Sequence, residues 1–163
     1  MDHDVTRIAS AALLLLSLSL LAACGSSGPV RRVSEPAANI QQLTVHADGS
    51  WTVEVRLDNF SSVPMRFDQL DATLAFAGQA PVPLRASPGM SIGPEAADVV
   101  DVTLVPPAGT KLAVADALLR DARLSYHLGG TVLATPEKGN QRRYDLDRDN
   151  ALSPVPGLPG VLR

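Results

Sequence analysis

The chain of 163 residues carries 14 Lys and Arg against 17 Asp and Glu, a net charge of −3, and 45% of its residues are hydrophobic. This length fits one compact domain, and the small negative charge has the wrong sign for a phosphate-binding surface, so we expect no nucleic-acid partner. The single cysteine excludes an internal disulfide and a multi-thiolate zinc site. With 19% charged residues the composition is not that of a disordered protein, and most of the chain should fold.

A run that is apolar apart from three serines occupies residues 8–23 (IASAALLLLSLSLLAA). Its 16 residues are fewer than the roughly 20 that a membrane-spanning helix needs, and the run ends in small residues. We interpret it as the hydrophobic region of a secretory signal peptide that covers residues 1–23. A buried helix of the folded domain is the alternative, but such a helix would need a polar face.

The run ends in Leu21-Ala22-Ala23-Cys24, which resembles the lipobox of bacterial lipoproteins. The resemblance implies that the Cys24 thiol receives a diacylglyceryl group, that the bond between Ala23 and Cys24 is cut, and that the new amino terminus is acylated, for example with palmitate. Several acyl chains together anchor a protein stably, whereas one does so only marginally. The alternative is a free buried thiol that fills space. Gly25, where an Asp would retain such a protein, implies the inner leaflet of an outer membrane, facing the periplasm.

The segment before the apolar run departs from the basic character of a signal peptide. Asp2 and Asp4 oppose Arg7 there. With the amino group the segment sums to about zero charge. Our hypothesis is that translation begins at the codon for Val5, which the mass of the uncleaved precursor tests.

We predict a flexible tether at residues 24–38, because this stretch has no hydrophobic period. Arg31 and Arg32 lie in it. They could touch anionic head groups, or they could be a solvated pair.

From residue 39 onward apolar and polar residues alternate, which predicts strands with one buried face. Residues 43–47 and 51–57 form the first predicted pair, joined at the hairpin signal Asp48-Gly49. Further strands are predicted at residues 70–76, 82–84, 100–104, 124–128, 131–135 and 142–147. Pro81 and Pro83 confine the segment at 82–84 to an edge strand or a loop.

A second hairpin is predicted at Gly129-Gly130, which would turn the chain between the strands at 124–128 and 131–135. The tail at residues 151–163 contains SPVPGLPGVLR, without any period, and is expected to be loosely ordered.

One segment, near residues 110–121, has a helical period, with Thr110 as the expected N-cap. Its apolar side should close one end of a β-sandwich. The residues predicted for that buried side are Leu112, Ala115, Leu119 and Ala122.

This order of elements over about residues 39–150 resembles the late embryogenesis abundant (LEA) type 2 proteins and their WHy (water stress and hypersensitive response) domain. The resemblance rests on residues 51–57 running into Asn59, on residues 70–78, on the serine- and glycine-rich stretch before residues 99–104, and on the helix followed by LSYHLGG at 124–130. The proline that often follows the asparagine in that family is absent here. The resemblance implies a fibronectin type III-like sandwich of about seven strands, a link to stress tolerance and no catalytic residue.

The chemistry that the residues offer is sparse. His46 and His127 are predicted to point to solvent, and no hydrolase, phosphate-binding or dinucleotide motif is present, so we expect neither an enzyme nor a cofactor. Asp145, Asp147 and Asp149 have the spacing with which a calcium loop begins, but its glycine and its final glutamate are missing. The alternative is the outward face of a strand.

Two functions remain open. One is a membrane-anchored, non-catalytic envelope module that acts in stress or desiccation protection or binds envelope components. The other is an accessory lipoprotein subunit that docks onto an envelope assembly or transport complex through an exposed sheet edge.

Overall fold

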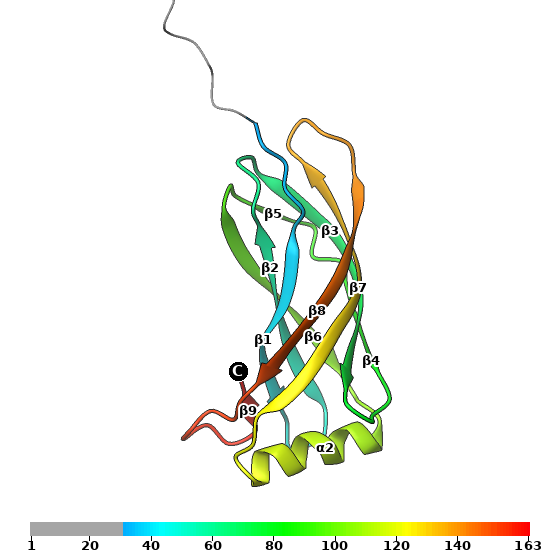
Figure 1. Ribbon diagram of the computed structural model, residues 1–163, viewed down its shortest axis with the longest axis vertical. Helices are drawn as coiled ribbons and strands as arrows, with labels where there is room; N and C mark the ends of the chain where they lie inside the picture. The colour runs from blue at the N-terminus through cyan, green and yellow to red at the C-terminus, as the bar shows by residue number, and fades with distance from the viewer. Residues whose placement is uncertain (1–30) are drawn as a thin grey trace, which may run out of the picture. The chain divides into compact units, whose positions relative to one another are not determined.

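Two antiparallel sheets packed face to face make up residues 31–163, the part of the chain that the computed structural model describes (Figure 1). The first sheet has the order β6 (Ala96–Leu104), β2 (Trp51–Asn59), β1 (Ala37–Val45), β9 (Val161–Leu162). The second has the order β4 (Val82–Ala86), β3 (Met65–Phe76), β7 (Leu124–Pro136), β8 (Arg142–Leu152), and β5 (Met90–Ile92) also pairs with β3. The expected all-β sandwich with one short helix is confirmed, with nine strands in the described residues where about seven were expected.

The core lies between the sheets and is built by the alternation seen in the sequence. Trp51, Val53, Val55 and Leu57 of β2 are all buried, whereas the residues between them are partly or fully exposed. Trp51 meets Phe76 of the opposite sheet edge-to-face, with ring centroids 6.4 Å apart and planes at 79°. Such aromatic pairs add about 1 kcal/mol beyond the area that they bury.

The second predicted hairpin is wrong, because β7 continues without a turn from Leu124 to Pro136. Gly130 lies opposite Ala72 of β3, and its φ is +144°. A Cβ atom at Gly130 would lie 2.4 Å from the Asp71 carbonyl oxygen and 2.5 Å from the Ala72 Cα. The glycine therefore permits a close approach of two strands instead of reversing the chain.

A hydrogen bond joins the two sheets beside a bulge in β1. The pairing of β1 with β2 shifts between Ile40 and Gln42, and the backbone N–H of Ile40 donates to the hydroxyl oxygen of Tyr126 in β7 at 3.1 Å. Burial raises the pKa of the Tyr126 hydroxyl. The contact gives a buried backbone donor of β1 a partner in the opposite sheet.

A buried side-chain amide ties together two loops at the end of the sandwich where the described chain begins. The amide nitrogen of Asn59, at the end of β2, donates to the carbonyl oxygens of Val63 at 2.9 Å, Ile92 at 3.1 Å and Gly93 at 2.8 Å. Its oxygen accepts the Ser61 N–H at 2.9 Å. Asn59, which carried part of the family resemblance, thus has a structural role, since it satisfies backbone groups that no strand pairs.

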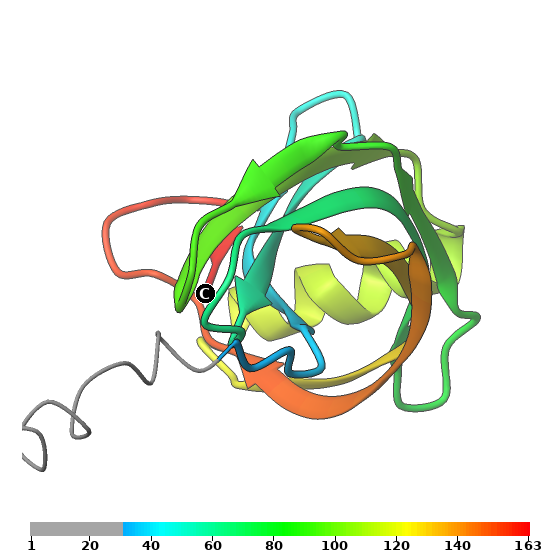
Figure 2. The same cartoon turned by 90° about the horizontal axis from the view of Figure 1, so that it is seen from above.

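Helix α2 (Ala108–Leu119) lies across the other end of the sandwich (Figures 1 and 2). The helix is confirmed, but the predicted buried face is wrong: Leu112 is 71% exposed and Leu119 is 87% exposed. The buried residues are Thr110, Val114 and Ala117. Thr110 is not the N-cap; its hydroxyl donates to the carbonyl of Ala80 at 3.2 Å and holds the helix against the β3–β4 turn.

The sandwich begins earlier in the chain than expected. Ala37 and Ala38, placed in the tether, are buried residues of β1. Arg32 also belongs to the domain, since its guanidinium donates to the Phe60 carbonyl at 3.1 Å and pairs with Glu95 at 3.0 Å. Arg31 donates to the carbonyl of Glu137. Arg31 and Arg32 therefore hold the start of the described chain against the sandwich. Neither contact with lipid head groups nor a solvated pair, the two interpretations of the sequence, included this role.

The expectation of a loosely ordered tail is wrong as well. Val161 and Leu162 form β9, which pairs with Thr44 and Leu43 of β1, and Leu162 is fully buried. The edge position of β4, with Pro83 inside it, agrees with the prediction made from its prolines.

Candidate functional site

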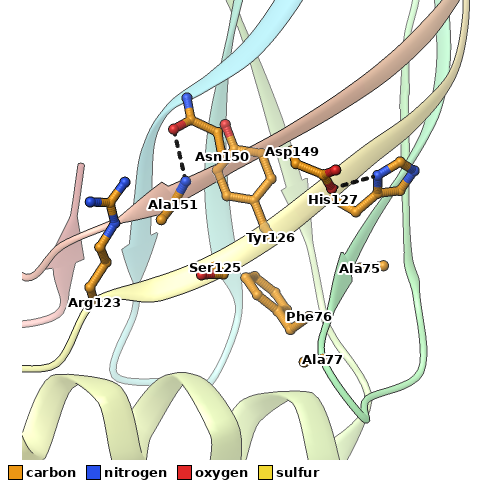
Figure 3. Close-up of a pocket in the computed structure, with 10 residues that line it drawn as sticks. All are labelled: Ala75, Phe76, Ala77, Arg123, Ser125, Tyr126, His127, Asp149, Asn150 and Ala151. Atoms are coloured by element: carbon orange, nitrogen blue, oxygen red, sulfur yellow. Dashed lines mark hydrogen bonds and ion pairs between the residues drawn. The ribbon is translucent and has the colours of Figure 1, made fainter.

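An open hollow of about 610 Å³ lies on the outer face of the sheet formed by β3, β7 and β8, near α2 (Figure 3). It brings Arg123, Ser125, His127 and Asp149 together, which are side chains of the kinds found in binding and catalytic sites. Its lining consists of Ala75 and Phe76 at the end of β3 with Ala77 after it, of Arg123 just before β7 with Ser125, Tyr126 and His127 in β7, and of Asp149, Asn150 and Ala151 in β8.

A histidine and a carboxylate meet in this hollow. His127 of β7 lies opposite Asp149 of β8 in the sheet register, and its Nδ1 is 3.0 Å from the Asp149 carboxylate and 3.8 Å from that of Asp147. The lack of a side chain at Gly129 leaves room for the imidazole ring, because a Cβ atom there would lie 2.9 Å from the His127 Nε2. Asp149 is 86% exposed, so solvent screens the pair and limits its contribution to stability to at most about 1 kcal/mol.

The hollow brings Ser125, His127 and Asp149 onto one face without forming a catalytic triad. A triad needs the second imidazole nitrogen to take the proton of the serine hydroxyl. Here Nε2 lies over Gly129, and Figure 3 shows the ring of His127 directed away from Ser125. The arrangement therefore offers a polar surface and does not activate the serine.

The weak calcium candidates Asp145, Asp147 and Asp149 all lie in β8, facing the same side of the sheet. Residues two apart along a strand are separated by about 6.6 Å, whereas a calcium loop curls its oxygens around one ion. Across residues 31–163, no three His, Cys, Asp or Glu side chains are grouped as a metal site requires. In this strand geometry the three carboxylates form a row of exposed charges.

The remaining polar candidates are structural. His46 is exposed in the β1–β2 turn, where its Nε2 lies 2.8 Å from the Thr52 hydroxyl, and it belongs to a different sheet from His127. Hydrogen bonds from Gln141 and Thr135, with a smaller effect of Arg66, hold the pKa of Asp68 below its usual value. These contacts stabilise the outer face of the sheet.

The residues predicted to carry the anchor, Ala23 and Cys24, lie outside the described residues. No helix among residues 31–163 has the length and apolar character that a membrane span needs.

A second surface, which the sequence did not reveal, is apolar and lies at the α2 end of the sandwich. Besides Leu112 and Leu119, Val105 just before the helix and Leu158 in the C-terminal loop are exposed. A groove of about 550 Å³ separates the C-terminal part of α2 from this loop, lined by Leu118, Leu119, Asp121 and the seven residues from Pro154 to Gly160. The helical period of the leucines was visible in the sequence, but it was interpreted as the buried side of the helix.

Comparison with known proteins gives similarity of fold. No protein-family model matches the chain, and no curated protein matches it. A solution structure described as a candidate late embryogenesis abundant protein is 15% identical, covers 96% of this chain and 87% of its own, and has a TM-score of 0.48.

Two further solved structures are similar at the same low level of identity. A candidate ApaA protein from Bordetella pertussis is 12% identical over 80% of this chain and 100% of its own, with a TM-score of 0.48. A solution structure from Arabidopsis thaliana is 15% identical over 80% of this chain and 85% of its own, with a TM-score of 0.41. The likeness concerns the β-sandwich alone, and function must be argued from the sites.

Proposed function

We propose that this chain is a lipid-anchored, non-catalytic envelope protein whose β-sandwich binds or shields other envelope components. The observation that carries the proposal is Leu21-Ala22-Ala23-Cys24 directly after the apolar run at residues 8–23. With Cys24 acylated, three acyl chains would hold the protein at the inner leaflet of an outer membrane.

The folded domain would then lie close to the membrane that carries it. Six residues, 25–30, separate Cys24 from Arg31, where the described domain begins. Fully extended, the seven steps from the Cα of Cys24 to the Cα of Arg31 span at most about 25 Å. The described chain enters the sandwich at the end opposite α2 (Figure 1), so α2 is at the end of the domain farthest from its point of attachment.

The proposal includes the absence of catalysis. The geometry of the residues that line the hollow in Figure 3 supports this part of it. Its His127–Asp149 pair is solvent-exposed, and the free ring nitrogen meets a glycine instead of a nucleophile. A surface of this kind orients a polar partner but supplies no activated group.

Intact mass analysis of the membrane-extracted protein tests the anchor. The expected mature chain begins at Cys24 and carries the added mass of three acyl chains, and Cys24→Ser should abolish both the cleavage and the added mass, because a hydroxyl does not replace the thiol. Ser26→Ala, two residues away, is the matched control and should leave both unchanged. An unmodified Cys24 thiol, or a mature chain that still contains Ala23, would contradict the anchor.

The stress setting, which follows from the family resemblance, is tested separately. The soluble chain from residue 25 onward, added to a drying-sensitive enzyme, should raise the activity recovered after rehydration above that obtained with an equal mass of albumin. Equal recovery with both proteins would remove the stress role and leave the anchored binding module.

The second candidate function is the accessory subunit of an envelope complex. The edge strand β8 is poorly suited to docking through a sheet edge, because it carries many charges, which discourage pairing with another strand. Those charges belong to Arg142, Arg143, Asp145, Asp147, Arg148 and Asp149. The exposed apolar surface at α2 favours a subunit role by another route.

A further inference from the structure

We propose that the end of the sandwich at which the described chain enters, opposite α2, rests on the lipid bilayer (Figure 1). Two apolar side chains there would enter the zone between head groups and acyl chains. Val33 is 43% exposed and Phe60 is 50% exposed. They lie in neighbouring segments, because residues 32–34 are hydrogen-bonded to residues 60–62.

The loop after β2 holds Phe60 at the surface. Its neighbours Asn59 and Ser61 are almost completely buried, 1% and 0% exposed, and Asn59 is fixed by four hydrogen bonds. The carbonyl oxygen of Phe60 accepts a hydrogen bond from the Arg32 guanidinium at 3.1 Å. Because the backbone on both sides is held by the fold, the Phe60 ring is displayed outward on a fixed loop.

The backbone on both sides of Val33 is bound to the same loop. The N–H of Arg32 donates to the Ser62 hydroxyl oxygen at 2.8 Å, and the Arg32 carbonyl accepts the Ser62 N–H at 3.0 Å. The N–H of Ser34 donates to the Ser61 hydroxyl oxygen at 3.0 Å. Val33 therefore belongs to the folded domain, beside the loop that carries Phe60.

The length of chain between Cys24 and this end identifies the bilayer as the occupant. The seven steps from Cys24 to Arg31 span at most about 25 Å, and Val33 follows two residues later. With Cys24 acylated, the contact is intramolecular, so a small apolar gain is enough to favour it. Aromatic side chains are also enriched at membrane interfaces. The inference deepens the proposed function and rests on it, because the anchor is what keeps the bilayer within reach.

The charges at this end are balanced. The N–H of Glu95 donates to the Ser61 carbonyl at 3.0 Å. The N–H of Glu137 donates to the Pro64 carbonyl at 2.8 Å. Four segments therefore meet here, which are residues 31–36, 60–64, 93–95 and 137–141. Together they contain three Lys or Arg residues and three Glu residues, a net charge of zero. The contact should therefore be apolar and insensitive to salt and to anionic lipid.

Spin labelling of the full, acylated chain in phosphatidylcholine vesicles tests the contact. Acylation consumes the Cys24 thiol and the chain has no other cysteine, so Val33→Cys or Phe60→Cys supplies a single free thiol for a nitroxide. Collisions with a polar nickel chelate should be about fivefold rarer at positions 33 and 60 than in the control Leu112→Cys, because lipid excludes polar solutes. Collisions with oxygen, which concentrates in lipid, should be more frequent. Leu112 is an apolar residue of α2, 71% exposed, at the opposite end.

A charge at position 60 should break the contact. With the nitroxide at position 33, Phe60→Glu should raise chelate collisions to the level found at position 112, because a carboxylate resists transfer into an apolar medium. Leu112→Glu is the matched control and should leave the label at position 33 shielded. Both positions are exposed, and thermal unfolding should show that both variants remain folded.

The collision pattern separates a bilayer from other occupants. Shielding of positions 33 and 60 from both chelate and oxygen would indicate a protein, and spectral broadening that disappears on dilution with unlabelled chain would indicate a second copy. Either result would overturn the proposal, as would equal collisions at positions 33, 60 and 112 or a contact that requires phosphatidylglycerol. The intact mass of the same sample distinguishes the two levels of inference. Labels in water on an acylated chain overturn the contact and leave the anchor, whereas a chain without acyl groups removes both.

Discussion

Gly130→Ala should destabilise the protein severely and in many hosts should abolish soluble expression. The new Cβ would overlap the backbone of β3, at 2.4 Å from the Asp71 carbonyl oxygen and 2.5 Å from the Ala72 Cα, in the middle of a sheet where backbone cannot yield. A side chain at φ +144° adds strain of its own. We expect a loss of about 3 kcal/mol or more in the free energy of unfolding, a large part of the 5–15 kcal/mol typical of a domain.

The neighbouring glycine provides the matched control for this prediction. In Gly129→Ala the new Cβ would meet the Nε2 of His127 at 2.9 Å, which is the end of an exposed side chain that moves easily. The free energy of unfolding from urea titration should then change by less than about 1 kcal/mol. If the two alanine variants unfold at the same denaturant concentration, the close approach of β3 and β7 at Gly130 is not as described.

Asn59→Ala should be the second most damaging of the changes considered. It removes the donor from three carbonyl oxygens, those of Val63, Ile92 and Gly93, and the acceptor from the Ser61 N–H, in a place that is almost fully buried. A buried polar group without a partner costs about 1–3 kcal/mol, so a total loss of about 3 kcal/mol is expected in urea or thermal unfolding. Water entering the cavity would reduce this loss.

Two further variants separate the hydrogen bonds of Asn59 from its volume. In Asn59→Asp the introduced carboxylate would face three carbonyl oxygens, so its folded pKa should be raised above the unfolded value. Stability should therefore be greatest at low pH and should fall as the pH rises through the folded pKa. Asn140→Ala, at an exposed position in the β7–β8 turn, should change stability by less than about 0.5 kcal/mol. A pH-independent loss for Asn59→Asp would contradict the network.

The sandwich could be predicted from the sequence because its strands have one buried face and one exposed face. Trp51, Val53, Val55 and Leu57 alternate with polar residues, and a period of two is a local property that needs no knowledge of the partner strand. Asp48-Gly49 gave the first hairpin correctly, since Gly49 has the φ of +81° that a tight turn uses. In these elements the local preference and the tertiary structure agree.

The errors share a physical cause, which is that a local pattern has more than one tertiary use. Gly129-Gly130 has the same composition whether it turns the chain or admits a neighbouring strand, and only the pairing with β3 distinguishes the two. In α2, apolar residues occur all round the helix, so the period did not identify the side that packs. Strand β9, two residues long, exists because β1 offers it an edge.

The candidate site was even less predictable than the fold. The contact between His127 and Asp149 depends on the register of β7 with β8, and the predicted turn at Gly129 would have separated those two residues. The apolar surface at α2 was visible as a pattern but was interpreted as core. The three aspartates of β8 were recognised as a row, and the strand determines that they do not converge.

The packing of β9 on β1 limits where the protein can be labelled. Leu162 is buried against β1, and the loop before it lies beside α2, so a reporter attached next to β9 would pull on a packed strand and disturb the contact between the loop and α2. The turn at residues 137–141 is exposed and lies at the other end of the sandwich (Figure 1). A tag inserted there would leave β9 and the α2 end of the sandwich undisturbed.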